Sequence, residues 1–222
     1  MNNKILAFIP ARANSKGVKN KNIKKLNGEP LVSITIDFAK KLEFVDYIVV
    51  CSDSLKIKKI AKDKKIDFIL RPDNLSTDES KVESSLIYTL QNFTKADLVE
   101  YILLLEPTSP FRKKKTVKKC LDILKKNKNY SVFTVCQTNK MFGQKKKDIF
   151  IPLFKNEKRR RQDRNKIYYE CGVVYCLRLE EFKKKKKILD TSSYAHEVDE
   201  IESIDINTNN DFKIAKLLCK KK

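Results

Sequence analysis

The 222-residue sequence contains no tryptophan, one histidine and four glycines. With His196 as the single histidine and no cysteine pair at CxxC spacing, the usual zinc-binding cluster lacks ligands, and we expect free thiols. No apolar run approaches the roughly 18 residues of a membrane span, and charge appears too early for a signal peptide. Neither GxxxxGK[ST] nor GxGxxG occurs, which excludes the two common glycine-rich phosphate loops. We therefore expect a cytoplasmic protein without a membrane partner.

Positive charge is what the sequence has in excess. It contains 49 lysines and arginines against 28 aspartates and glutamates, a formal net charge of +21. Such a balance favours anionic partners, and it keeps a basic nucleic-acid-binding protein open as one reading. The lysines are distributed in many short runs along the chain, which is more typical of solvated faces than of one binding stripe. No aromatic-rich RNA motif, zinc finger or helix-turn-helix spacing accompanies them.

Short apolar runs alternate with longer amphipathic ones. Most of the short runs are continuously apolar, as buried parallel strands are, and the longer ones have helical spacing. This alternation predicts an α/β fold, a Rossmann-like and mostly parallel sheet with helices on both faces, in a single domain over 1–222. The expected strands cover 4–10, 46–52, 67–71, 100–107, 131–137, 172–178 and 203–206, and the expected helices cover 30–42, 54–65, 82–93, 116–127 and 210–221.

The segment 137–170 breaks this rhythm, because it is polar, basic and irregular. A structureless stretch of that length inside a compact domain is usually functional or an inserted lobe. Its apolar pieces DIFIPLF and IYY could pair as a hairpin. We interpret it as a small inserted lobe, with Phe150 and Phe154 as packing or oligomer contacts.

The loop after the first expected strand, FIPARANSKGVKNKNIKKLNG, gathers cations and amides in a few residues. A nucleoside triphosphate carries roughly four negative charges, and its phosphates need such donors in a partly desolvated site. An exposed basic loop would have the same composition. The candidate phosphate ligands are Arg12, Ser15, Lys16, Lys21 and Asn22.

Three other strand ends carry candidate residues, because ligands of open α/β sheets bind beyond the carboxyl ends of strands. Arg71 lies at the end of the third expected strand and Thr77 follows it, and Glu106, at the end of the fourth, begins the rigid turn EPTSP. Asp205 and Asn207 alternate in an extended segment, so both oxygens can face one cation, and oxygen ligands suit Mg²⁺. Each feature, read alone, is also compatible with a structural turn or a helix cap, and Asp-x-Asn is the weakest of the three signals.

Taken together and in this order, these pieces resemble the family of CMP-N-acylneuraminate synthetases, the cytidylyltransferases that activate sialic, legionaminic and related nonulosonic acids. The opening stretch is similar to the family signature ARxxSKGxxxKNIxxLxGxPL. The resemblance continues through CSDS, RPDNLSTDES, LLLEPTSPFR, RRQDRNKIYYECGVVY and SIDINTNNDFKIA, and so covers nearly the whole chain.

The resemblance implies that CTP and an acidic nine-carbon sugar give a CMP-sugar and pyrophosphate, with Mg²⁺ required. It implies that Arg161 holds the sugar carboxylate, that Glu106 contacts the sugar, and that the inserted lobe 137–170 reaches across a homodimer. It implies that Asp205 and Asn207 hold the metal, with Asp205 helping to deprotonate the anomeric hydroxyl. The remaining residues that it implies for the nucleotide and for catalysis are Arg12, Ser15, Lys16, Lys21, Asn22, Arg71 and Thr77.

Several positions depart from the family pattern. Glu106 stands where the pattern has glutamine, Cys171 where it has asparagine, and Asn207 where it has a second aspartate. The departures concern the sugar and metal side more than the nucleotide side. A nucleotidyltransferase acting on another sugar acid such as Kdo, or a glycosyltransferase of similar fold, therefore stays open as an alternative.

Overall fold

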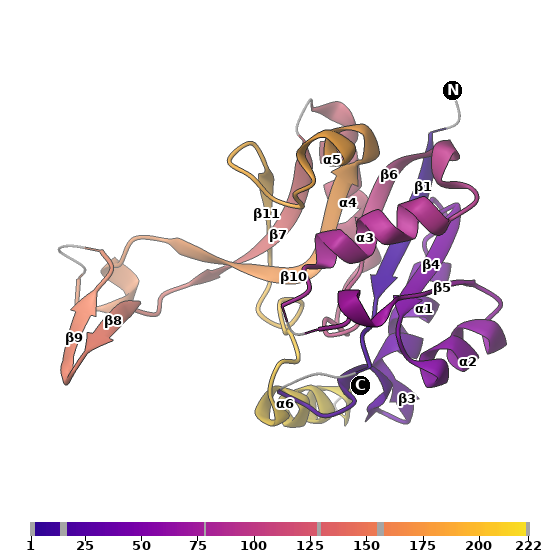
Figure 1. Cartoon of the computed structure of the whole chain (residues 1–222). Coiled ribbons are helices and arrows are strands. Elements are labelled where there is room, and N and C mark those ends of the chain that lie inside the picture. The colour runs from indigo at the N-terminus through magenta and orange to yellow at the C-terminus, as the bar shows by residue number, and fades with distance from the viewer. Residues whose placement is uncertain (1–2, 14–16, 78, 128–129, 155–157, 221–222) are drawn as a thin grey trace.

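The computed structural model describes residues 3–13, 17–77, 79–127, 130–154 and 158–220. Its centre is a seven-stranded sheet with the order β11-β7-β10-β6-β1-β4-β5 (Figure 1). Within the described residues all neighbouring pairs of this sheet are parallel except those of β10, which runs antiparallel to β6 and β7. The strands are β1 (Lys4–Pro10), β4 (Tyr47–Ser52), β5 (Asp67–Leu70), β6 (Val99–Leu104), β7 (Ser131–Thr138), β10 (Ile167–Arg178) and β11 (Tyr194–Val198).

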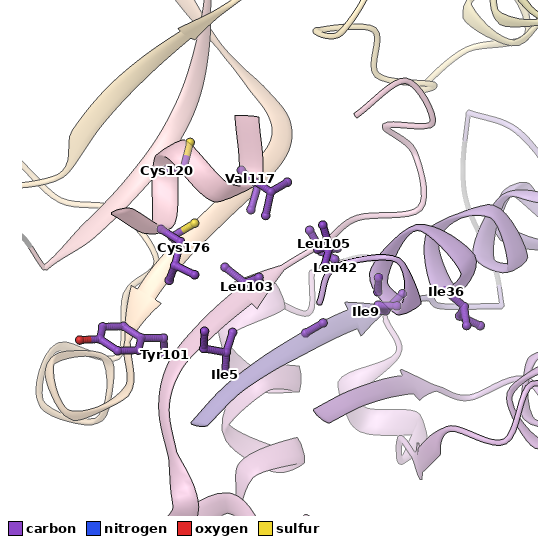
Figure 2. Close-up of a cluster of buried hydrophobic side chains, with 14 of the residues drawn as sticks. Ile5, Ile9, Ile36, Leu42, Tyr101, Leu103, Leu105, Val117, Cys120 and Cys176 are labelled. Atoms are coloured by element: carbon purple, nitrogen blue, oxygen red, sulfur yellow. The ribbon is translucent and has the colours of Figure 1, made fainter. Parts of the chain in front are cut away.

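Helices cover both faces of the sheet, as predicted. Alternate side chains of β1 explain why its sequence is continuously apolar, because Ile5 and Ile9 face one core while Leu6 and Phe8 face the other. The first core, part of which Figure 2 shows, includes side chains of three helices, and the second includes side chains of two. The helices of the first core are α1 (Leu31–Lys40), α2 (Leu55–Asp63) and α4 (Lys114–Lys126). The helices of the second core are α3 (Val82–Asn92) and α5 (Leu179–Lys185).

The last helix, α6 (Asn209–Lys220), packs beside the small pair β2 (Lys25–Leu26) and β3 (Glu29–Pro30). Thr208 and Asp211 form a reciprocal cap at its start, since Thr208 Oγ1 accepts from Asp211 N and Asp211 Oδ2 accepts from Thr208 N. Asp211 Oδ2 also accepts from the backbone N–H of Asn207 at 3.0 Å. The start of α6 therefore fixes the chain that carries Asp205 and Asn207.

Three details of the sequence prediction are wrong. The segment 203–206 is not a strand, because its Ile206 N–H bonds the loop carbonyl of Thr108 at 2.9 Å; the edge strand is β11 instead. The helix α5 was not predicted, because only Leu179 and Phe182 are buried in a highly charged run. Finally, DIFIPLF does not pair with IYY: β9 (Ile149–Pro152) pairs with the polar β8 (Gly143–Lys146), while IYY begins β10 and pairs with β7.

The segment from Gln137 to Glu170 projects from the sheet as an arm (Figure 1). It contains the ends of β7 and β10, the β8–β9 hairpin and the short 3-10 helix η4 (Arg161–Asp163). We refer to 137–170 as the arm. Arg164 braces its base by donating to the carbonyls of Asn139, Lys158 and Arg159. Among the described residues, no helix combines the length and the apolar character needed to cross a lipid bilayer.

Candidate active site

A pocket of about 270 Å³ lies beyond the carboxyl ends of β1, β5 and β6. It brings together candidates from four separate stretches of sequence, which is what the strand-end rule predicts for an open α/β sheet. Ser15 and Lys16 lie outside the described residues. The predicted site residues that line this pocket are Arg12, Lys21, Asn22, Arg71, Thr77, Glu106, Asp205 and Asn207.

The described residues of the loop after β1 are held by hydrogen bonds to side chains. The side chain of Asn22 is buried, and its Nδ2 donates to the Arg12 carbonyl at 2.8 Å. The backbone N–H of Ala13 donates to Asp53 Oδ1 at 2.7 Å. The guanidinium of Arg12 lies 3.4 Å from the carbonyl of Thr77 on the opposite wall of the pocket. Arg12 and Asn22 therefore line the pocket from positions that hydrogen bonds fix.

Arg71 lies at the end of β5 with its side chain buried. Its Nε donates to Ser76 Oγ at 3.2 Å, its Nη1 to Ser85 Oγ at 3.1 Å and its Nη2 to Asp53 Oδ1 at 3.3 Å. A buried guanidinium needs such partners, because an unpaired one would carry a large desolvation cost. Arg71 thus faces the pocket from a fixed position.

Lys21, Asn207 and Asp205 form a chain of hydrogen bonds at one end of the pocket. Lys21 Nζ donates to Asn207 Oδ1 at 3.0 Å, and Asn207 Nδ2 donates to Asp205 Oδ2 at 2.5 Å. Burial lowers the pKa of Lys21, and the charges of Asp205 and Glu106 oppose this shift. Asp205 Oδ1 is buried and has no hydrogen-bond partner among the described residues. The pocket therefore presents a desolvated ammonium beside a partly unsatisfied carboxylate.

The basic loop also approaches this chain through its glycine. A Cβ atom added at Gly17 would lie 2.0 Å from the backbone oxygen of Asn207, far inside any normal contact. Only a residue without a side chain allows the two backbones to approach this closely. The structure thus brings the segments 17–22 and 205–207 side by side, although 182 residues lie between them in sequence.

Glu106 follows β6 and is half-buried between the pocket and β10. Its pKa is raised to about 7, first by burial and then by the charge of Asp205, while the charges of Arg112 and Lys21 oppose the increase. A Cβ atom at Gly172 would lie 2.8 Å from Glu106 Oε2, so β10 packs tightly against this carboxyl group. Near neutral pH the side chain therefore exchanges between a neutral acid and a carboxylate.

We expect Glu106→Gln to remove a pH dependence of stability. The ordinary pKa of this carboxyl group is 4.5, and its pKa in the folded state is about 7. The contribution of Glu106 to the free energy of unfolding is therefore fully present below pH 4.5 and is lost as the pH rises through about 7. Relative to the variant, the wild-type free energy of unfolding should fall by roughly 2 kcal/mol across that window. Urea denaturation at pH 5 and pH 8 measures this difference. The exposed Glu43→Gln is the control, and equal pH profiles for E106Q and wild type would contradict the prediction.

A second pocket, of about 520 Å³, adjoins the first and shares Asp205 and Asn207 with it. Its wall carries Lys140, Glu170 and the pair Tyr169–Ser203, whose hydroxyl oxygens lie 2.9 Å apart. The shared residues stand where the two pockets meet. Two molecules bound in the two pockets would therefore approach each other beside Asp205.

Arg161 is the one described candidate that the structure does not bring to either of these pockets. It lies in η4 on a third pocket of about 750 Å³, with Lys140 and Arg164. In a single chain, Arg161 therefore does not line the pocket of Lys21, and its own pocket meets the second pocket at Lys140. Its predicted role stays a prediction.

Sequence reasoning assigned no role to three side chains that hold the site together: Asp53, Ser85 and Arg112. Asp53 directly follows a strand, so the strand-end rule could have indicated it. Ser85 lies inside a helical pattern and Arg112 inside a basic run, where nothing local distinguishes them. Arg112 is buried and donates through Nε to the Val173 carbonyl at 2.6 Å and through Nη2 to the Glu106 carbonyl.

Comparison with known proteins gives the family. The Cytidylyltransferase profile matches residues 6–220. The N-acylneuraminate cytidylyltransferase of Escherichia coli O18:K1:H7 is 31% identical over 232 residues, which cover 100% of this chain and 54% of that protein. The CMP-N,N'-diacetyllegionaminic acid synthase of Legionella pneumophila is 40% identical over 124 residues, covering 55% of this chain and 53% of that one. The chain spans about half the length of the E. coli protein.

A solved structure supports the fold independently. The structure of CMP:2-keto-3-deoxy-manno-octonic acid synthetase complexed with CTP superposes with a TM-score of 0.74, covering 99% of this chain and 100% of that one. Its sequence identity is 12%, so the likeness concerns the fold alone. The profile match extends over nearly the whole chain and includes every described residue of the pocket. The chain therefore belongs to the cytidylyltransferase family.

Proposed function

We propose that this chain transfers CMP from CTP to the anomeric hydroxyl of a nonulosonic acid, of the sialic or legionaminic type, and releases pyrophosphate. The observation that carries the proposal is the pocket in which Arg12, Lys21 and Arg71 surround one cavity beside Asp205. Three cations around one small cavity suit a triphosphate. The names of the relatives support the class of sugar acid.

The reaction needs positioning and charge neutralisation more than covalent help. The hydroxyl oxygen of the sugar attacks the α-phosphorus, the bond from that phosphorus to the bridging oxygen breaks, and pyrophosphate leaves with its electron pair. Lys21 and Arg12, with Lys16, would stabilise the charge that develops on the phosphoryl oxygens, while Ser15, Asn22 and Thr77 would orient the nucleotide. Asp205, where the two pockets meet, would accept the proton of the attacking hydroxyl.

We also propose that Mg²⁺ binds at Asp205 and Asn207. The fit rests on Asp205 Oδ1, which is buried without a hydrogen-bond partner among the described residues, and on an all-oxygen donor set, which Mg²⁺ prefers. The amide nitrogen of Asn207 now faces Asp205, so its side chain would have to turn to offer its oxygen. When bound, Mg²⁺ supplies Lewis-acid neutralisation of phosphate charge.

The experiment that tests the function is pyrophosphate release by the purified chain with CTP and Mg²⁺. The acceptor panel contains N-acetylneuraminic, legionaminic and pseudaminic acids together with Kdo, and a reaction without acceptor is the control. We expect release with at least one nine-carbon acid and not with Kdo. Release with Kdo alone would favour the alternative substrate, and no release with any acid would refute the proposal. Thermal shifts with CTP, UTP, GTP and ATP test the base.

We propose further that the chain is a homodimer joined through the arm. Ile149, Phe150 and Leu153 on its hairpin are 68, 52 and 57% exposed, which is a large apolar area for one projecting element. Pairing would cover this area, and it would allow Arg161, which does not line the Lys21 pocket of its own chain, to act at the partner's site.

The mass in solution should therefore be twice that of the chain, because the dimer buries the apolar tip of the arm. Light scattering measures this, and Phe150→Glu should give a monomer with reduced turnover. Leu217→Glu is the matched control, since Leu217 is 62% exposed on α6, which Figure 1 shows apart from the β8–β9 hairpin. A monomeric wild type, or a dimeric F150E, would contradict the dimer.

We assign the chain to the cytoplasm on the state of its thiols. Five of the six cysteines are buried as thiols outside any disulfide. Free buried thiols are the rule in reducing compartments, where disulfides rarely persist.

A further inference from the structure

We propose that Asp53, at the end of β4, is a positioning residue that fixes the loop after β1 in the shape that holds the nucleotide phosphates. The inference rests on the proposed function and adds a residue to it. Asp53 does not line the pocket itself, so its effect would pass through the residues that do.

The first contact is with the backbone of the loop. Asp53 Oδ1 accepts the Ala13 N–H at 2.7 Å, one residue beyond Arg12. The Asp53 side chain is only 14% exposed, so this bond is partly shielded from water. A backbone N–H that loses its partner in such a place is costly, and the loop would move to recover a hydrogen bond.

The second contact is with Arg71. The same Oδ1 accepts from Arg71 Nη2 at 3.3 Å, and the Arg71 side chain is 6% exposed. Through its other nitrogens Arg71 bonds Ser76 after β5 and Ser85 in α3. One carboxylate oxygen therefore connects the β1 loop, the β5 loop and α3, which are three walls of the same pocket.

The chain offers a matched control at the other end of β1. Asp46 also accepts one backbone N–H, that of Ile5 at 2.8 Å, and one side-chain cation, Lys4 Nζ at 2.8 Å. It lies at the opposite edge of the sheet from the pocket. Loss of Asp46 should cost stability without any effect on nucleotide binding.

The geometry also predicts how a conservative variant behaves. Both bonds use Oδ1, so the amide oxygen of Asp53→Asn can accept them while the negative charge is lost. Asp53→Ala removes the acceptor altogether. We therefore expect D53A to disturb the loop conformation most and D53N to disturb it less, relative to wild type.

The test combines calorimetric titration of each protein with CTP and with cytidine. We expect D53A to raise the Kd for CTP by about tenfold and the Kd for cytidine much less, because cytidine has no phosphates for the loop to hold. D53N should recover most of the affinity, and D46A should lower the Tm without changing either Kd. A wild-type Kd for CTP in D53A, or an equal loss in D46A, would overturn the proposal. Asp53→Ser replaces D53A if that variant does not fold.

Hydrogen exchange of the nucleotide-free protein gives a readout that does not depend on the proposed function. Peptides covering 9–13 should exchange faster in D53A than in wild type and D46A, since the Ala13 N–H has lost its acceptor. If wild type binds no CTP, the proposed function fails while this comparison still decides the role of Asp53. Unchanged exchange in D53A would refute that role.

Discussion

Replacing Lys21 with alanine should lower kcat for pyrophosphate release by about 10²–10³-fold. The ammonium group lies desolvated beside Asp205 and Glu106, and its Nζ is 3.0 Å from Asn207 Oδ1, at the end of the pocket where the phosphates would react. A preorganised cation in a partly water-excluded site commonly contributes several kcal/mol to the transition state, since no solvent has to reorganise. Steady-state kinetics with CTP and the accepted sugar acid measure the loss.

Lys24→Ala is the matched control for this experiment. Lys24 lies three residues further along, and its Nζ donates to a second asparagine, Asn209 Oδ1, at 3.2 Å, yet Lys24 does not line the pocket. We expect near wild-type turnover from K24A. Equal losses in both variants would mean that Lys21 acts only by fixing the C-terminal segment. Turnover of K21A within a few-fold of wild type would remove Lys21 from the mechanism.

Replacing Arg112 with methionine should lower the free energy of unfolding by about 3–5 kcal/mol. Burial lowers the pKa of this guanidinium to about 10, so it remains charged at neutral pH, and it supports the carbonyls of Glu106 and Val173. Without it two buried carbonyls lose their donors, and the carboxylate of Glu106 loses a compensating charge. Because Glu106 is neutral below its pKa of about 7, the loss should be larger at pH 8 than at pH 6.

Urea denaturation at the two pH values measures this effect. Arg112→Lys should rescue little, because an ammonium cannot reproduce the planar fork that reaches two carbonyls. The control is Arg178→Met: Arg178 also donates to carbonyls, those of Leu124 and Asn127, at a partly exposed position far from Glu106. R178M should lower the free energy of unfolding by only about 1 kcal/mol, and by the same amount at both pH values. A pH-independent loss in R112M would contradict the coupling to Glu106.

Glu106 illustrates what the residue identities could indicate and what they could not. The sequence shows a carboxylate where the family pattern has an amide, and near two anionic substrates it should repel them unless it is protonated or paired. Both conditions apply in part: its pKa is raised to about 7, and the buried Arg112 lies close enough to oppose that shift. The degree of burial behind this balance comes from β10 packing against the turn, which no local pattern specifies.

The β8–β9 hairpin shows a strand pairing that the sequence pattern did not predict. Its first strand, Gly143–Lys146, is polar and was not predicted, because two of its four residues are lysines and none is strongly apolar. Pairing with Ile149–Pro152 follows from a two-residue turn in which Lys147 adopts a φ of 52°, a conformation that few lysines take. Strand pairing is a non-local property, so periodicity alone selected the wrong partner.

The sequence by itself determined the alternation of strands and helices, the two-sided core and the strand ends at which polar residues gather, because burial on both faces and helical amphipathicity leave periodic signals. Tertiary structure alone decided which strand ends meet. It placed Gly17 against Asn207, joined Ala13 to Arg71 through Asp53, and left Arg161 on a separate pocket. These contacts join residues far apart in sequence, and packing of the sheet, rather than any local preference, fixes the distances between them.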